Sequence, residues 1–163
     1  MIKNLIKYIF SFLQTLYLFE SKKNIKLLTY KNITLRKFNS INTIKDKNLK
    51  KYLIKEKKIQ RFNNNCKLFV LFYKKNIVSI GWMYEGKTWY IEEVNKKITI
   101  KNKILLFDYK TFEKYQKKGF YVKILNLIKN MRTKKKFLIY CLKSNKASVK
   151  GIINSNFSLK KII

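Results

Sequence analysis

A strand pattern that passes into a helix through a single glycine is the feature that most constrains this chain. Residues 104–109 are apolar enough for a buried strand, and apolar residues recur at helical spacing over 121–131. The joint contains Gln-Lys-Lys-Gly at 116–119, with one of only four glycines in the protein. Such a joint leaves backbone N–H groups unpaired at the positive end of the helix dipole. It therefore predicts a phosphate-binding site.

The charge balance allows two interpretations. The 163 residues carry 39 Lys and Arg against 8 Asp and Glu, a formal net charge of +31. One explanation is a polyanionic partner, such as nucleic acid, an anionic membrane or a polyphosphate ligand. The other is codon bias, because Lys, Ile, Asn, Phe and Tyr dominate, as A/T-rich codons would produce, and the lysines are spread along the chain.

The residue types that are missing limit the chemistry. The chain has no histidine, which removes the usual general base and the usual partner of a nucleophile. Its two cysteines, Cys66 and Cys141, lie in apolar runs and are predicted to be buried free thiols rather than a disulfide or a metal site. Catalysis must therefore use a carboxylate, tyrosine, backbone groups or water.

The N-terminal segment, residues 1–31, is predicted to be helical. Residues 8–19 form an uncharged run of twelve, which is too short for a membrane span of about 20 residues. No small-residue cleavage site follows the run, so no export signal is recognised and a cytoplasmic location is expected. Two alternatives remain: a helix packed on the domain or on a partner, or an interfacial helix that brings residues 1–23 onto an acidic membrane.

The rest of the chain shows strand and helix patterns without a linker. The order is strand, helix, an antiparallel meander, helix, strand, helix, strand, which predicts a mixed sheet flanked by helices, an α/β (mixed α+β) fold. The predicted strands are 32–37, 68–73, 77–84, 89–94, 104–109, 137–142 and 157–163, and the predicted helices are 46–62, 118–131 and 147–154.

Three short motifs follow one another along residues 32–163. They are the hairpin sequence at 69–82, Tyr-Gln-Lys-Lys-Gly-Phe-Tyr at 115–121, and Asn-Lys-Ala-Ser at 145–148 followed by Asn-Phe at 156–157. Together they resemble the GNAT superfamily of acyl-coenzyme A-dependent N-acyltransferases. The resemblance implies a mainly antiparallel sheet with helices on both faces, and an activity that moves an acyl group, most often acetyl, directly to an amine.

The chain departs from the family pattern at several positions. Tyr121 replaces the second glycine of the loop, Glu113 replaces the usual proline before it, and Asn156 replaces the late glycine. The tyrosine that many members use as general acid would fall near Ile152, so that role is vacant. The sequence also ends after the strand at 157–163, where many members have one more strand.

The resemblance also implies how acetyl-coenzyme A, or another acyl-coenzyme A, would bind without a metal. Backbone N–H groups of residues 116–121 would hold the pyrophosphate, and the pantetheine arm would pair with the strand at 104–111. A backbone N–H near Lys110 or Thr111 would polarise the thioester carbonyl. The cofactor-binding residues expected on this basis are Lys110, Thr111, Gln116, Lys117, Lys118, Gly119, Phe120, Tyr121, Asn145 and Ser148.

The acceptor amine must lose a proton, so a carboxylate is needed. The candidates are Asp108, Glu92 and Glu93. If Glu92 and Glu93 lie on a strand, their side chains point to opposite faces and at most one of them faces the cleft.

The acceptor side of the site is predicted to be aromatic. Trp82, Tyr84, Trp89 and Tyr90 would line it, and aromatic surfaces suit sugar rings, which favours a small amine such as an amino sugar. The protein is expected to be a monomer or a homodimer.

Two alternatives to an active enzyme remain. A lysine-rich surface with many Tyr and Phe could bind RNA by stacking bases on aromatic rings. The aromatic residues lie mostly within apolar strand runs, however, which is typical of a core. The other alternative is a degenerate member of the family that binds coenzyme A without transferring the acyl group.

Overall fold

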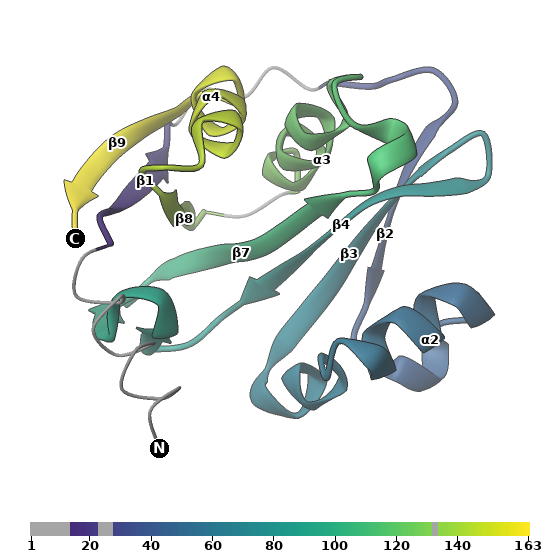
Figure 1. Ribbon diagram of the computed structural model, residues 1–163, viewed down its shortest axis with the longest axis horizontal. Helices are drawn as coiled ribbons and strands as arrows, with labels where there is room; N and C mark the ends of the chain where they lie inside the picture. Colours follow the sequence, from purple (N-terminus) through teal and green to yellow (C-terminus); the bar gives the residue numbers. More distant parts are fainter. Residues whose placement is uncertain (1–13, 23–27, 132–133) are drawn as a thin grey trace.

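The computed structural model describes residues 14–22, 28–131 and 134–163, and its centre is a seven-stranded sheet (Figure 1). The strand order is β2-β3-β4-β7-β8-β1-β9. Only β7 and β8 run parallel; every other neighbouring pair is antiparallel. The strands are β1 (Leu16–Ser21), β2 (Ile33–Phe38), β3 (Cys66–Tyr73), β4 (Asn76–Tyr84), β7 (Lys103–Thr111), β8 (Lys136–Leu142) and β9 (Phe157–Ile162).

Helices cover both faces of the sheet. Helix α2 (Lys47–Lys55) lies on one face, and α3 (Phe120–Lys129) and α4 (Lys146–Asn154) lie on the other (Figure 1). The amphipathic helix α2 buries Leu49 and Leu53 against the sheet, because these residues are spaced one turn apart. The predicted fold class, a mainly antiparallel sheet with helices on both faces, is confirmed.

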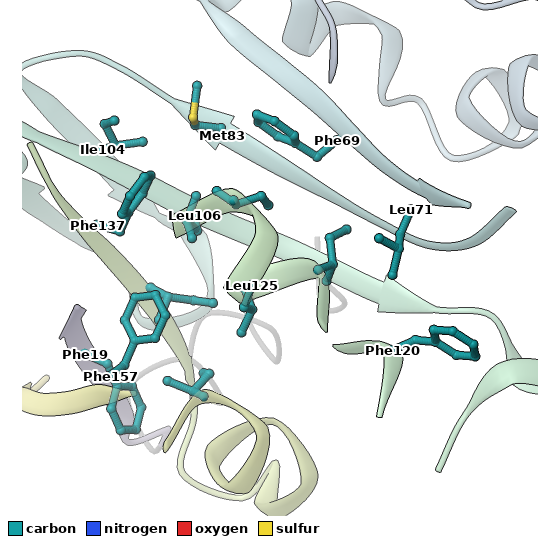
Figure 2. Packing of buried hydrophobic residues seen from close by; sticks show 14 of the residues in the cluster. Phe19, Phe69, Leu71, Met83, Ile104, Leu106, Phe120, Leu125, Phe137 and Phe157 are labelled. Carbon is teal, nitrogen blue, oxygen red and sulfur yellow. The ribbon is translucent and has the colours of Figure 1, made fainter. Parts of the chain in front are cut away.

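The larger core lies between the sheet and helices α3 and α4. Figure 2 shows its side chains, which come from elements far apart in the sequence. Phe120 and Leu125 of α3 belong to one buried cluster with Phe69 and Leu71 of β3 and Leu106 of β7. Burial of these large side chains is the main favourable term that holds the helices to the sheet.

The prediction of a helix at the N-terminus is wrong for the part of the run that the structure describes. Residues 16–21 form strand β1, which lies between β8 and β9 and pairs antiparallel with both. Apolar side chains point to both faces, with Leu18 and Phe19 each nearly fully buried. A strand buried on both faces has a continuous apolar run, which periodicity alone cannot distinguish from a buried helix. Residues 8–13 of the run lie outside the described residues.

Two other predicted elements end early. The helix expected at 46–62 stops at Lys55, because Lys57 adopts a left-handed conformation (φ 53°), and a short 3-10 segment, η2 (Ile59–Asn64), follows. The strand expected at 89–94 stops at Ile91. This strand, β5 (Thr88–Ile91), pairs with β6 (Lys96–Thr99) in a separate two-stranded sheet, and the 3-10 turn η3 (Glu92–Val94) links the two strands.

No helix in the described part of the chain is long and apolar enough to cross a membrane. The other predicted strands and helices occur within a few residues of their expected bounds.

A single carboxylate anchors the N-terminal strand electrostatically. Glu20 of β1 forms ion pairs with Lys103 of β7 (2.6 Å), Lys136 of β8 (3.0 Å) and Lys160 of β9 (2.8 Å). Burial acts to raise the pKa of Glu20, but hydrogen bonds from the three lysines outweigh it and lower the pKa to about 2. Glu20 therefore stabilises the arrangement in which β1 lies among these strands.

We expect Glu20→Gln to lower the free energy of unfolding at pH 7 by roughly 1 kcal/mol, since partly exposed ion pairs are screened by solvent. The depressed pKa means that this stabilisation is present above the ordinary value of 4.5 and is lost as the pH falls towards 2. Urea unfolding at pH 7, 4 and 2.5 measures it. The difference from wild type should shrink with falling pH. Glu56→Gln is the control, because Glu56 is exposed and forms no ion pair within the described residues; an equal loss there would contradict the role of Glu20.

Candidate active site

A cavity opens where the two parallel strands separate. The register of β7 and β8 ends at the pair Leu106–Ile139, although β7 continues to Thr111 and β8 to Leu142. The space has a volume of about 600 Å³. Its walls come from η2 on one face of the sheet, from the ends of α3 and α4 on the other, and from the β5–β6 turn. The cavity therefore reaches both faces of the sheet.

A β-bulge in β7 shapes the centre of this cavity. Phe107 pairs with Trp82 and Lys110 with Ile80, so the single residue Gly81 opposes both Asp108 and Tyr109. Asp108 takes a left-handed conformation with φ 49°, which aspartate tolerates better than most residues. A Cβ at position 81 would overlap the Tyr109 ring, so only glycine fits there. The bulge places both Asp108 and Tyr109 in the cavity wall.

Asp108 is held by two cations from the η2 side. Lys58 Nζ lies 2.8 Å from Asp108 Oδ2, and Arg61 Nη1 donates a hydrogen bond to the same oxygen. Burial acts to raise the pKa of Asp108, but the hydrogen bonds and charges of Lys58 and Arg61 outweigh it, so the pKa is lowered. Asp108 is thus a stable carboxylate, which makes it a weaker proton acceptor than its position in the sequence suggested.

The two glutamates of the β5–β6 turn both line the cavity. They lie on the 3-10 turn η3 rather than on a strand, so the strand rule that sent their side chains to opposite faces does not apply. Both are exposed. Glu93 also acts electrostatically on the Tyr140 phenol, which lines the cavity and accepts a hydrogen bond from Trp89 Nε1 at 3.3 Å. Burial first, and then the charge of Glu93, raise the pKa of Tyr140, so its phenol is neutral.

The four aromatic residues predicted for the acceptor side separate into two pairs. Trp89 and Tyr90 line the cavity. Trp82 is fully buried in the core beside Phe62, and Tyr84 packs on Trp89 with ring centroids 4.8 Å apart, so neither is part of the cavity wall. Trp82 lies in β4, a central strand, so its side chain is covered by neighbouring side chains. The spacing of the aromatic residues in the sequence could not reveal this burial.

The loop before α3 has the geometry of an anion site. Gly119 precedes the helix with φ 74°, and no described side chain caps the helix or places a negative charge in its first turn. A Cβ at Gly119 would meet nothing within 4 Å, so the space beside this backbone is open. Uncapped N–H groups next to open space fit a phosphate. Lys117 and Lys118 are exposed beside it.

The remaining predicted cofactor residues have diverse surroundings. Asn145 and Ser148 line the cavity, and Asn145 Oδ1 caps α4 by accepting a hydrogen bond from Ser148 N at 3.0 Å. Gln116 Nε2 donates to the carbonyl of Thr111 at 3.2 Å, which ties the loop to the end of β7. Phe120 is buried in the core, so it can contribute only backbone groups to a ligand at the loop, and Lys110 Nζ lies over the Tyr52 ring.

Sequence reasoning missed ten residues of the cavity wall, five of which have titratable side chains. These five reach it from elements whose approach is set by tertiary packing: Lys58, Arg61, Tyr109, Tyr140 and Cys141. Arg61 carried a faint signal, because it is one of only three arginines among 39 basic residues. Burial raises the pKa of Cys141 to about 11, so this cysteine is a neutral thiol and a poor nucleophile.

Solved structures have the same arrangement of strands and helices, whereas no protein-family model and no curated protein matches the sequence. An acetyltransferase described as a GNAT-family member, from Novosphingobium aromaticivorans, superposes with a TM-score of 0.62 at 7% identity, over 91% of this chain and 61% of that one. The fold is that of the GNAT superfamily.

Two further GNAT structures support this result. An acetyltransferase from Colwellia psychrerythraea gives a TM-score of 0.53 at 12% identity, over 90% of this chain and 53% of that one. A GCN5-related N-acetyltransferase-like protein from Streptococcus suis gives 0.52 at 13% identity, over 98% and 64%. The chain thus spans less than two thirds of these neighbours, and identities this low show the fold alone.

The departures from the GNAT motifs are accommodated by local packing. The ring of Tyr121 packs against Gly151 of α4. Because Gly151 has no Cβ, which would overlap the ring, the bulky side chain of Tyr121 fits there. Its hydroxyl hydrogen-bonds the side chain of Ser148 at the cavity wall. Asn156 has the left-handed conformation (φ 60°) that a glycine would adopt there, and Ile152 is fully buried.

We expect Tyr109→Phe to raise the free energy of unfolding by about 1 kcal/mol. The Tyr109 hydroxyl is buried without a hydrogen-bond partner among the described residues, and an unsatisfied buried hydroxyl is unfavourable. Chemical unfolding of the unliganded protein measures the change. Tyr140→Phe is the matched control, because it removes a hydroxyl that accepts a bond from Trp89 and should lose stability instead. A loss of stability in Tyr109→Phe would show that the hydroxyl is satisfied in solution.

Proposed function

We propose that this protein is an acyl-coenzyme A-dependent N-acyltransferase that acetylates a primary amine of a small molecule. The observation that carries the proposal is the cavity between the diverging strands β7 and β8, with an uncapped helix N-terminus at its α3 side. Residues 110, 111 and 116–120 do not line the cavity themselves, but Tyr121 in the first turn of α3 does, so the anion cradle and the edge of β7 would adjoin a chamber with carboxylates.

The residues of the α3 side fit coenzyme A. Backbone N–H groups of residues 116–121 would hold the pyrophosphate beside Gly119, with Lys117 and Lys118 adding charge. The unpaired edge of β7 beyond Leu106, including the backbone of Lys110 and Thr111, would hydrogen-bond an extended arm. When bound, the cofactor supplies an activated acyl thioester.

The carboxylate chamber would deprotonate the acceptor. Glu93 is our proposed base, because it is exposed in the cavity and acts on the Tyr140 phenol, while Glu92 lies beside it on the same turn. Asp108 is a less suitable base, since its lowered pKa reflects its ion pairs with Lys58 and Arg61. The Tyr121 phenol lies in the cavity wall and is protonated at neutral pH, so it is our proposed proton donor for the role that Ile152 leaves vacant, even though burial raises its pKa and weakens it as an acid.

The acceptor would lie between the η3 turn and the aromatic wall. Trp89 and Tyr90 offer ring faces there, which suits an amino sugar or another amine with a flat, partly apolar body. The RNA-binding alternative is less favoured, because many large aromatic residues, such as Trp82, Phe69 and Phe137, are buried in the core. The other alternative is a protein that binds coenzyme A but does not transfer the acyl group. Measuring coenzyme A binding and acetylation separately, as described next, distinguishes it from an active enzyme.

Titration calorimetry with acetyl-coenzyme A tests the cofactor site. We expect micromolar binding by wild type, and Gly119→Asp should weaken it at least about tenfold more than Gly119→Asn. Asn and Asp are nearly isosteric and both tolerate the left-handed conformation of Gly119, so the difference isolates charge from backbone strain. If the two substitutions weakened acetyl-coenzyme A binding equally, the pyrophosphate would not bind at this loop. If wild type did not bind acetyl-coenzyme A, the proposed function would be overturned.

Steady-state acetylation with an accepted amine tests the base. Glu93→Gln should lower kcat by about 100-fold, because general-base catalysis contributes at least that much. Glu92→Gln, on the same turn, should lower it by less than about tenfold. Coenzyme A affinity should stay within twofold for both variants. A larger effect at Glu92 would exchange the two roles, and unchanged kcat in both would assign proton removal to water or another group.

A further inference from the structure

The charges on the η2 side of the cavity are unbalanced. Lys58 and Arg61 both contact one oxygen of Asp108, so two cations share one carboxylate and one positive charge remains. The side chains are only partly exposed, at 13% for Lys58 and 30% for Arg61, so solvent screens this charge less than at an open surface. A second acidic group would complete the balance.

Arg61 is positioned to receive such a group. Its guanidinium lies over the Trp82 ring (5.3 Å) and the Phe107 ring (5.2 Å), and it is tied to Asp108 through Nη1. This is its one hydrogen bond within the described residues, so further N–H donors of the fork are left for a ligand in the cavity it lines. A guanidinium held by two rings and a carboxylate is pre-organised to bind a carboxylate or a phosphate.

The part of the cavity wall that comes from η3 has the reverse charge. Glu92 and Glu93 line the cavity and form no ion pair within residues 14–22, 28–131 and 134–163. Tyr140 lines the same cavity as these charged residues, and its phenol accepts a hydrogen bond from Trp89 Nε1. The cavity is therefore polarised, with a cationic end at η2 and an anionic end at η3.

We propose that the acceptor amine also carries an acidic group, a carboxylate or a phosphate, which Arg61 and Lys58 bind while Glu92 and Glu93 face the amine. The inference rests on the proposed function and specifies its substrate class. An α-amino acid or a phosphorylated amino sugar satisfies it. A neutral amino sugar lacks the acidic group, and a polyamine would place positive charge against Arg61.

Two pairs of amines that differ only by the acidic group test the proposal. They are phenylalanine with phenethylamine and glucosamine 6-phosphate with glucosamine, each assayed with acetyl-coenzyme A and also titrated calorimetrically into the protein without cofactor. The acid-bearing member of at least one pair should show a tenfold or larger advantage in kcat/KM and in affinity. The two pairs distinguish a carboxylate from a phosphate.

Substitutions at Arg61 locate the effect. Arg61→Gln should abolish the advantage of the acid-bearing amine and leave the neutral partner within twofold. Arg61→Lys, which keeps the ion pair with Asp108, should retain only part of the advantage. Arg36→Gln is the matched control, because Arg36 also lies over an aromatic ring, that of Phe72 at 5.0 Å, but not at the cavity. The Arg36→Gln variant should prefer the acid-bearing amine over the neutral amine as strongly as wild type does. Thermal unfolding checks that each variant is folded.

The outcomes separate the two proposals. Neutral amines acetylated as fast as their acid-bearing partners would overturn this inference and leave the acyltransferase intact. Arg61-dependent binding of an acid-bearing amine, without coenzyme A binding, would support the anion subsite and overturn the acyltransferase. If Arg61→Gln lowered kcat/KM and affinity equally for both amines of a pair, Arg61 would have only a structural role, and its proposed role in specificity would be overturned.

Discussion

The bulge opposite Gly81 is the constraint on which the candidate site depends. One residue of β4 faces two residues of β7, so the strand changes direction at Asp108 and parts from β8 after Leu106. Because the two strands separate, backbone groups are left without a strand partner and a cavity replaces the next rows of the sheet. The same bulge directs Asp108 towards η2 and lays Tyr109 over Gly81. Without it, β7 and β8 could continue their parallel ladder and close the space.

The N-terminal strand completes the other half of the sheet. Although the strand at the C-terminal end, β9, follows α4 in the sequence, it pairs with β1 rather than with β8. Glu20 of β1 ties this half together through lysines of β7, β8 and β9. In a chain with 39 basic and 8 acidic residues, each carboxylate is a scarce partner for lysine charge. Codon bias can supply the lysines, but the fold determines where the few carboxylates balance them.

The charge of the cavity differs in kind from the charge of the surface. Spread lysines give the molecule a general attraction for anions. The cavity instead brings together Arg61, Lys58 and Asp108 on one wall and two glutamates on the other. Charges of both signs at set positions would favour a ligand that has both signs itself, so the selectivity that we propose follows from geometry rather than from the net charge.

The sequence by itself determined the local features: the strand–glycine–helix joint and most strand and helix positions. These depend on short-range periodicity, so neighbouring residues suffice to predict them. Only the tertiary structure decided that residues 16–21 form an internal strand, that Trp82 is core, and that Arg61 meets Asp108 across 47 positions. Burial on both faces, the bulge and the approach of η2 to β7 arise from long-range packing, which a local pattern does not contain.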